Sequence, residues 1–350
     1  MEMDSNWCRP TPGQCCRAYR PTIPDINDIV DNLNCTAYLV ADDMKIFSGI
    51  RSDIDIDILQ TGINTVARWT DKWHLKLMNA KKCKTMTIGI SYAGPAHIYH
   101  LPTGSASDGE VLTRVTQEND LGVLIDSDLH FENHILEKVK ICNRITGLIR
   151  RNFTNMNFQS FTQLYKAMIR SHLEYAQTVW SPYKVKLIDE VEKVQNVQLK
   201  FFLVSDTYLY RRARGDMIEV FKIIHGYYDQ EGVPRLQLSL YPNARGHDKK
   251  LFKLQSHLDL RKYCFTDRVV SKWNSLPADV VNAPSVDAFK GRLDRFWSSQ
   301  EVRFNYKAEF ELPLNYSIVC WSQTMTWIHR PLWPSSNSRL RLPLIVLRQD

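Results

Sequence analysis

Two adjacent aspartates, Asp42 and Asp43, stand between two short apolar runs of the sequence. Carboxylate oxygens are the ligands that Mg²⁺ prefers in proteins, so a pair of carboxylates in a turn can hold a divalent cation. Two cations about 4 Å apart would activate an attacking hydroxyl and stabilise a leaving phosphate in nucleotidyl transfer. Aspartates are also common turn residues, and the pair by itself is more typical of a simple turn than of a catalytic site.

Hydrophobic periodicity predicts the elements that would position this pair. A hairpin of residues 37–40 and 45–47 would place both aspartates at its tip. A short amphipathic helix over 25–33 precedes the hairpin, and a helix over 53–77 follows it. Residues 85–90 and 121–125 have the composition of strands and are separated by glycines and prolines.

From residue 130 onward the pattern changes to helical. Apolar stripes at helical spacing run over 135–149, 161–173, 187–201 and 217–224, and the last of these ends before Gly226. Ser285 is a suitable N-cap for a further helix. Residues 1–22 and 301–350 show little periodicity, so we expect both ends to be irregular.

Composition limits the class of protein. The chain has 350 residues, 44% of them hydrophobic, and a net charge of +7, which suits a partner carrying phosphates but is also common among proteins without one. None of the eight cysteines forms a Cys-x-x-Cys pair or has zinc-finger spacing. The acidic start is unlike a signal peptide, and no apolar run has the length of a membrane span. These features predict a soluble cytoplasmic or nuclear protein that is neither secreted nor bound in a membrane.

An ordered series of motifs resembles the reverse transcriptases of non-LTR retrotransposons, the LINE-like elements of the jockey and chicken-repeat type. The motifs are Ile26-Asn27-Asp28, Ala41-Asp42-Asp43, Trp69 and Trp73, Asn79-x-x-Lys82, Leu121-Gly122-Val123, His172-Leu173-Glu174-Tyr175, Trp180-Ser181-Pro182, Arg211-Arg212-Ala213-Arg214 and Lys272-Trp273-Asn274. The resemblance covers roughly residues 23–310. It implies an α+β fold in which part of a palm (23–128) precedes a helical thumb (129–205) and a C-terminal helical region (206–300).

The resemblance also implies roles for particular residues. Asp42 and Asp43 match the metal-binding acids, with Mg²⁺ as the expected cofactor, and Lys82 matches a lysine that assists departure of pyrophosphate. A solvated lysine run is the alternative for Lys82. Leu121, Gly122 and Val123 match the primer-grip turn. Basic residues of the thumb would follow the backbone of an RNA–DNA template–primer hybrid: Lys138, Lys140, Arg144, Arg150 and Arg151.

Departures from the family pattern bear on activity. Val40 stands where the family has an aromatic residue, and the fingers, a first palm strand with its own metal-binding aspartate and the nucleotide-binding segment are not found before residue 23. We therefore expect an RNA-directed DNA polymerase remnant that is inactive alone and exposes an unpaired sheet edge. It has no small-molecule cofactor in this interpretation.

Two alternatives remain open at the level of sequence. A non-catalytic nucleic-acid-binding module is favoured by the basic helices and in particular by Arg211, Arg212 and Arg214. A decayed product without selected function is favoured by the unmatched tail. A nuclease built on Asp42 and Asp43 is disfavoured, because no further acid or histidine has suitable spacing.

Overall fold

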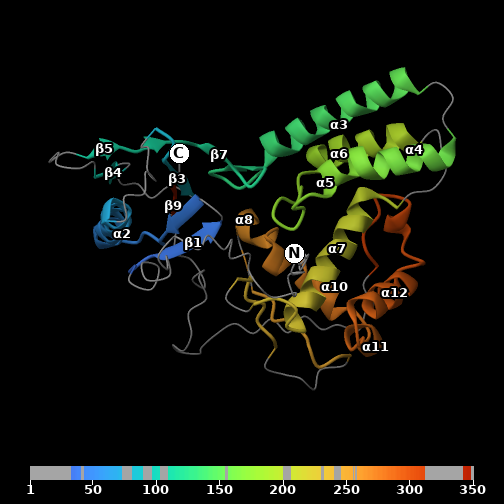
Figure 1. Cartoon of the computed structure of the whole chain (residues 1–350). Helices are drawn as coiled ribbons and strands as arrows, with labels where there is room; N and C mark the ends of the chain where they lie inside the picture. The colour runs from blue at the N-terminus through green and yellow to red at the C-terminus, as the bar shows by residue number, and fades with distance from the viewer. Residues whose placement is uncertain are drawn as a thin grey trace, which may run out of the picture. The chain divides into compact units, whose positions relative to one another are not determined.

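The computed structural model describes residues 33–40, 43–72, 81–89, 97–102, 109–153, 157–199, 206–229, 232–239, 246–254, 256, 258–311 and 342–347. Its internal contacts divide the chain into two compact units (Figure 1). Unit 1 comprises Met1–Leu129 together with Asn337–Asp350, and unit 2 comprises His130–Ser336. The fold mixes helices and strands, which confirms the predicted α+β class.

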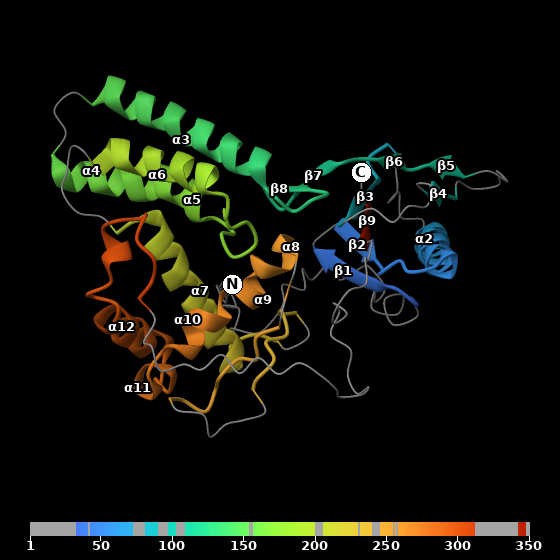
Figure 2. The ribbon, with the colours of Figure 1, turned by 180° about the vertical axis from the view of Figure 1, so that it is seen from behind.

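A mixed sheet forms the centre of unit 1, and its strands follow the order β1-β2-β9-β3-β6 (Figure 2). Their bounds are Thr36–Val40 for β1, Asp43–Phe47 for β2, Leu342–Leu347 for β9, Lys84–Ile88 for β3 and Thr113–Arg114 for β6. Neighbouring strands are antiparallel except β3 and β6. The predicted hairpin is thus confirmed as β1 and β2.

Helix α2 (Asp53–Lys72) connects β2 to β3. It begins with a reciprocal cap in which the carboxylate of Asp55 accepts the N–H of Ser52 at 2.9 Å, while the Asp55 N–H donates to the Ser52 carbonyl. Leu59 and Ile63 on one stripe of the helix are fully buried against Ile46 of β2. Burial of this apolar stripe explains why the helix lies along the sheet.

Two further hairpins belong to unit 1. Strands β4 (His100–Leu101) and β5 (Glu110–Val111) form one, and β7 (Gln117–Asp120) and β8 (Val123–Asp126) form the other. The predicted strand over 121–125 was wrong at its start. Leu121 and Gly122 make the turn between β7 and β8, because both take a positive φ that a strand does not accommodate.

The C-terminal tail also differs from the prediction. We expected residues 301–350 to be irregular, but Glu301–Arg303 form a 3₁₀ turn (η2) and Leu342–Leu347 form the strand β9. Strand β9 pairs with β2 on one side and with β3 on the other. The edges of β2 and β3 that face each other are therefore both paired with β9. The unpaired sheet edge that we expected is not present at this position.

Unit 2 is helical (Figure 1). Its elements are α3 (Glu132–Asn152), α4 (Phe158–Leu164), the π-helix η1 (Tyr165–Arg170), α5 (Ser171–Glu174), α6 (Val185–Leu199), α7 (Tyr208–Ile224), α8 (Asp259–Lys262), α9 (Phe265–Arg268), α10 (Val270–Asn274), α11 (Ala278–Val281) and α12 (Val286–Phe296). The Ser285 side chain caps α12 by accepting the Ala288 N–H at 3.2 Å, as predicted. Gly226, at φ +70°, follows the end of α7, also as predicted.

One apolar core joins the later helices of unit 2. Phe221 of α7 stacks on Phe289 of α12 with ring centroids 4.4 Å apart, and Trp273 of α10 is buried beside them. Helix α6 contacts α7, so the regions predicted as 129–205 and 206–300 pack within a single unit. Among the described helices, none is both long enough and apolar enough to cross a membrane.

Candidate nucleic-acid interface

One end of the unit 1 sheet gathers several of the residues that the sequence singles out. In the register across the sheet, Lys45 of β2 stands beside Val346 of β9, and Val346 stands beside Lys84 of β3. Strands β2 and β3 therefore begin at the same end of the sheet, one strand apart. Asp43 is the first residue of β2, and the exposed Lys82 lies in the turn just before β3. Asp42 and the side chain of Asp43 lie outside the described residues.

The predicted primer-grip residues form the tip of the β7–β8 hairpin. Asp120 pairs with Val123, which leaves Leu121 and Gly122 as a two-residue turn with φ of 47° and 79°. Positive φ at both positions is the pattern of a type I′ turn, in which glycine or asparagine is usual and leucine is strained. The Leu121 side chain is 56% exposed, whereas Val123 is buried. The turn therefore presents an apolar side chain outward at a conformational cost.

Two ion pairs attach this hairpin to the same end of the sheet. Lys45 Nζ lies 2.5 Å from a carboxylate oxygen of Asp120, the residue before the turn. Lys84 Nζ lies 2.7 Å from a carboxylate oxygen of Glu118, which is 5% exposed. Lys45 lies near the start of β2, and Lys84 is the first residue of β3. The two ion pairs therefore hold the β7–β8 hairpin, with its Leu121–Gly122 turn, at the end of the sheet where Asp43 and Lys82 lie.

Binding of Mg²⁺ at this end of the sheet would require several oxygen ligands. Asp42 and Asp43 are hard oxygen donors of the right kind. Strand β2 lies between β1 and β9, and neither Thr36–Val40 nor Leu342–Leu347 includes a carboxylate. Within the described part of the chain, no group of three or more His, Cys, Asp or Glu side chains could hold a metal ion. Asp43 is the one acidic residue in the described strands of this sheet.

Helix α3 carries the basic residues predicted for the thumb. Lys140, Arg144 and Arg151 are exposed. Their spacing of four and seven residues places them on one face of the helix. Arg150 is also exposed, but it lies off this face. The exposed Glu137 lies on the same face, seven residues before Arg144, so this face carries three cations and one carboxylate and has a net positive charge suited to phosphate groups.

Lys138 occupies a different position on α3. It is half-buried, and its charge acts on His134, which is 1% exposed and packs edge-on against Trp180. Burial, with a smaller contribution from Lys138, lowers the pKa of His134 to about 4. Lys138 is therefore less exposed than the other four basic residues predicted for the thumb.

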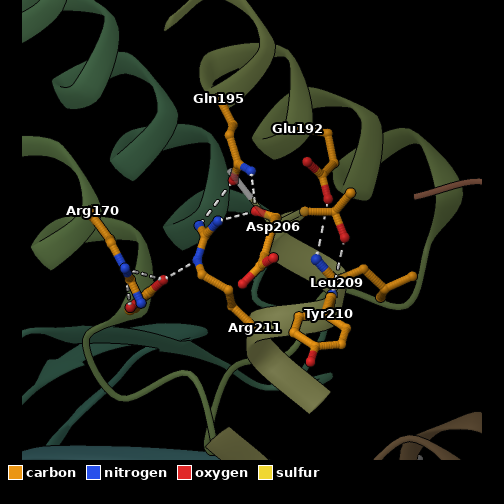
Figure 3. Close-up of polar contacts among 9 residues, drawn as sticks. Arg170, Glu192, Gln195, Asp206, Leu209, Tyr210 and Arg211 are labelled. Carbon is orange, nitrogen blue, oxygen red and sulfur yellow. Dashed lines mark hydrogen bonds and ion pairs between the residues drawn. The ribbon is translucent and has the colours of Figure 1, made fainter. Parts of the chain in front are cut away.

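The structure places Arg211 inside the helical unit (Figure 3). Its side chain is 7% exposed, and its Nε donates to Glu174 of α5 at 2.5 Å. Its remaining nitrogens donate to the Asp206 carbonyl and, at 2.9 Å, to Gln195 Oε1 of α6. Glu174 also accepts from Arg170 Nε at 2.8 Å. Arg211 thus joins α5, α6 and α7.

The other two arginines of this cluster are bonded as well. Arg212 donates to the Pro182 carbonyl at 2.7 Å, and burial lowers the pKa of its guanidinium. Arg214 forms a bidentate pair with Asp294 of α12 at 2.5 and 2.8 Å. These contacts give all three arginines partners within unit 2, and the nucleic-acid contact expected from sequence stays a prediction. The sequence does not reveal this, because the partners lie as far as 80 positions away.

Sequence reasoning also missed Lys45, Lys84, Glu118 and Asp120, although each is a neighbour of a motif residue. Their only signal was position next to the acidic turn, the lysine run and the Leu-Gly-Val motif. A search of protein-family models, of curated proteins and of solved structures found no match to this chain.

Proposed function

We propose that this chain is a reverse-transcriptase-like protein of the non-LTR retrotransposon type that binds an RNA–DNA template–primer duplex and does not extend the primer by itself. The observation that carries the proposal is the convergence at one end of the unit 1 sheet. The start of β2 at Asp43, the Lys82 turn and the Leu121–Gly122 turn meet there. The motifs that contain Asp43, Lys82 and Leu121 resemble parts of a single polymerase site, and that resemblance does not depend on this geometry.

Two further features support duplex binding. The exposed stripe of Lys140, Arg144 and Arg151 on α3 can neutralise phosphates along a nucleic-acid backbone. The exposed, strained Leu121 is suited to contact with a sugar or base at a primer end, because strain of this kind persists where function requires the conformation.

The sheet also accounts for the proposed lack of polymerisation. Two-metal catalysis needs carboxylates that hold both cations in place. The two strands next to β2, Thr36–Val40 and Leu342–Leu347, contain no acidic residue. Catalysis of phosphoryl transfer depends mainly on holding the metal ions and the reacting groups in position. Two aspartates without a third metal-binding carboxylate are therefore expected to give little catalysis.

The test uses the full chain and a fluorescent RNA–DNA hybrid, with affinity measured by anisotropy at several salt concentrations. The triple variant Lys140→Gln, Arg144→Gln, Arg151→Gln is expected to bind at least about tenfold more weakly at low salt, because each lost phosphate contact removes about 0.9 from the slope of log affinity against log salt.

The matched control removes the same charge elsewhere in unit 2, at Lys290, Arg295 and Lys307, each replaced by Gln. It is expected to retain most of the affinity. An equal loss in both variants would mean that only net charge matters, and it would contradict a specific contact through α3. Primer extension by the wild-type chain with Mg²⁺ and dNTPs, lost in Asp42→Ala, would contradict the proposed inactivity.

A further inference from the structure

The sheet of unit 1 contains a slot that is one strand wide. Strands β2 and β3 run parallel, are joined through α2 and do not pair with each other, because β9 lies antiparallel between them (Figure 2). Adjacent strands lie about 4.8 Å apart, so the two edges facing the slot are about 10 Å apart. The buried packing of Ile46 against α2 fixes the position of β2 in this arrangement. Without β9, the edges of β2 and β3 would remain unpaired.

The strand in the slot comes from a distant part of the sequence. Every partner of β9 lies in residues 44–47 and 84–88, whereas β9 itself follows all of unit 2. Residues 312–341 connect the last described residue of unit 2 to β9. A chain extends by up to about 3.3 Å per residue, so a connection of this length can reach more than one acceptor.

Strand β9 is held between β2 and β3 by the pairing of its backbone with both strands. Pro343 pairs only with Thr87 of β3 and has no partner on β2, so its missing N–H falls where the strand has a single neighbour. The six residues Leu342–Leu347 are all apolar. Outside its slot, such an apolar strand has unpaired backbone groups, which favour pairing with another unpaired edge.

We propose that Leu342–Leu347 exchanges between two copies of this chain, each copy filling the slot between β2 and β3 of the other. A second copy offers the same edges in the same register, so the exchanged pairs are identical to those within one chain. The proposal is independent of nucleic-acid binding and rests on sheet topology alone.

Mixed copies with single cysteine substitutions test the exchange. One copy carries Ile46→Cys and the other Ile345→Cys, two positions that are Cα partners in the register and therefore within disulfide reach. After joint incubation at high concentration and oxidation, peptide mass spectrometry is expected to find the 46–345 disulfide between copies. A copy with Leu342→Cys, which pairs only with Ile88, is the control and is expected to give no link to position 46.

One chain carrying both Ile46→Cys and Ile345→Cys makes the test decisive. If this double variant forms its internal disulfide while mixed copies do not link, the register is correct and exchange does not occur, which overturns the proposal. Absence of the 46–345 disulfide both within and between copies of the double variant also overturns it, because β9 then occupies the slot of neither copy.

Light scattering after size exclusion provides a second measurement. Val346→Pro removes an N–H from a position paired on both sides and is expected to abolish the dimer. Leu342→Pro affects a position paired only with β3 and is expected to leave the dimer in place. Dimerisation of Val346→Pro equal to that of wild type would contradict strand exchange.

Discussion

Leu121 shows how a single residue links conformation to the proposed function. Its φ of 47° lies in the left-handed region, which costs an ordinary L-residue about 1–2 kcal/mol. The side chain is exposed, so burial does not compensate this cost. The residue before it, Asp120, is held by Lys45, so the strained turn has a fixed place at the end of the sheet.

At the residue scale we predict opposite effects of Leu121→Asn on stability and on binding. Asparagine tolerates positive φ, so the free energy of unfolding measured in urea should rise by about 0.5–1 kcal/mol. The affinity for an RNA–DNA hybrid should fall, because the apolar contact at the turn is lost.

Ile98→Asn is the matched control for this variant. Ile98 is also 56% exposed and belongs to unit 1, but it lies outside the β7–β8 hairpin. Equal hybrid affinities of the two variants would contradict a role for Leu121 in binding.

At the scale of elements, the arginines of α7 join this helix to several neighbouring elements of unit 2. Its Arg211 bonds to α5, to α6 and to the Asp206 carbonyl (Figure 3), while its Arg214 bonds to α12. The two arginines occupy the same helix and both meet a carboxylate. They differ in burial, since the Arg211 side chain is 7% exposed and that of Arg214 is 29% exposed.

The difference in burial predicts that truncating Arg211 lowers the free energy of unfolding more than truncating Arg214. Arg211→Ala should lower the free energy of unfolding of unit 2 by about 3 kcal/mol, because it leaves buried polar partners without a donor. Arg214→Ala should cost about 1 kcal/mol or less, because solvent screens its pair. Tryptophan fluorescence during urea titration follows the transition through Trp180, Trp273 and Trp297. Similar losses for both variants would contradict the assignment of Arg211 as the central bond of the three helices.

The elements themselves were largely predictable from sequence, and their partners were not. Amphipathic stripes predicted the helices of unit 2, because those stripes are buried in its cores. The Leu121–Gly122 turn was mistaken for strand because leucine carries no turn signal. Strand β9 was missed because its six residues form a strand by pairing with β2 and β3, which precede it by about 250 positions or more in the sequence. The partners of Arg211 and Arg214 were hidden for the same reason.

At the scale of the whole molecule, the proposed function assigns different contacts to the two units. In that proposal the Leu121–Gly122 turn of unit 1 contacts the primer end, and the basic residues of α3 in unit 2 contact backbone phosphates. The sheet of unit 1 is completed by an apolar strand that adds no carboxylate. Together these features support the proposal that the protein binds a duplex and does not extend a primer.

Photo-cross-linking of a bound hybrid tests this description most directly. An RNA–DNA hybrid with a photoreactive base at the primer 3′ end is irradiated with the full chain, and the linked peptides are identified by mass spectrometry. The predicted result is a link to the hairpin Gln117–Asp126, with Leu121 at its centre, and no extension of that primer with Mg²⁺ and dNTPs. Binding of the hybrid with links confined to residues outside this hairpin, or extension of the primer, would contradict it.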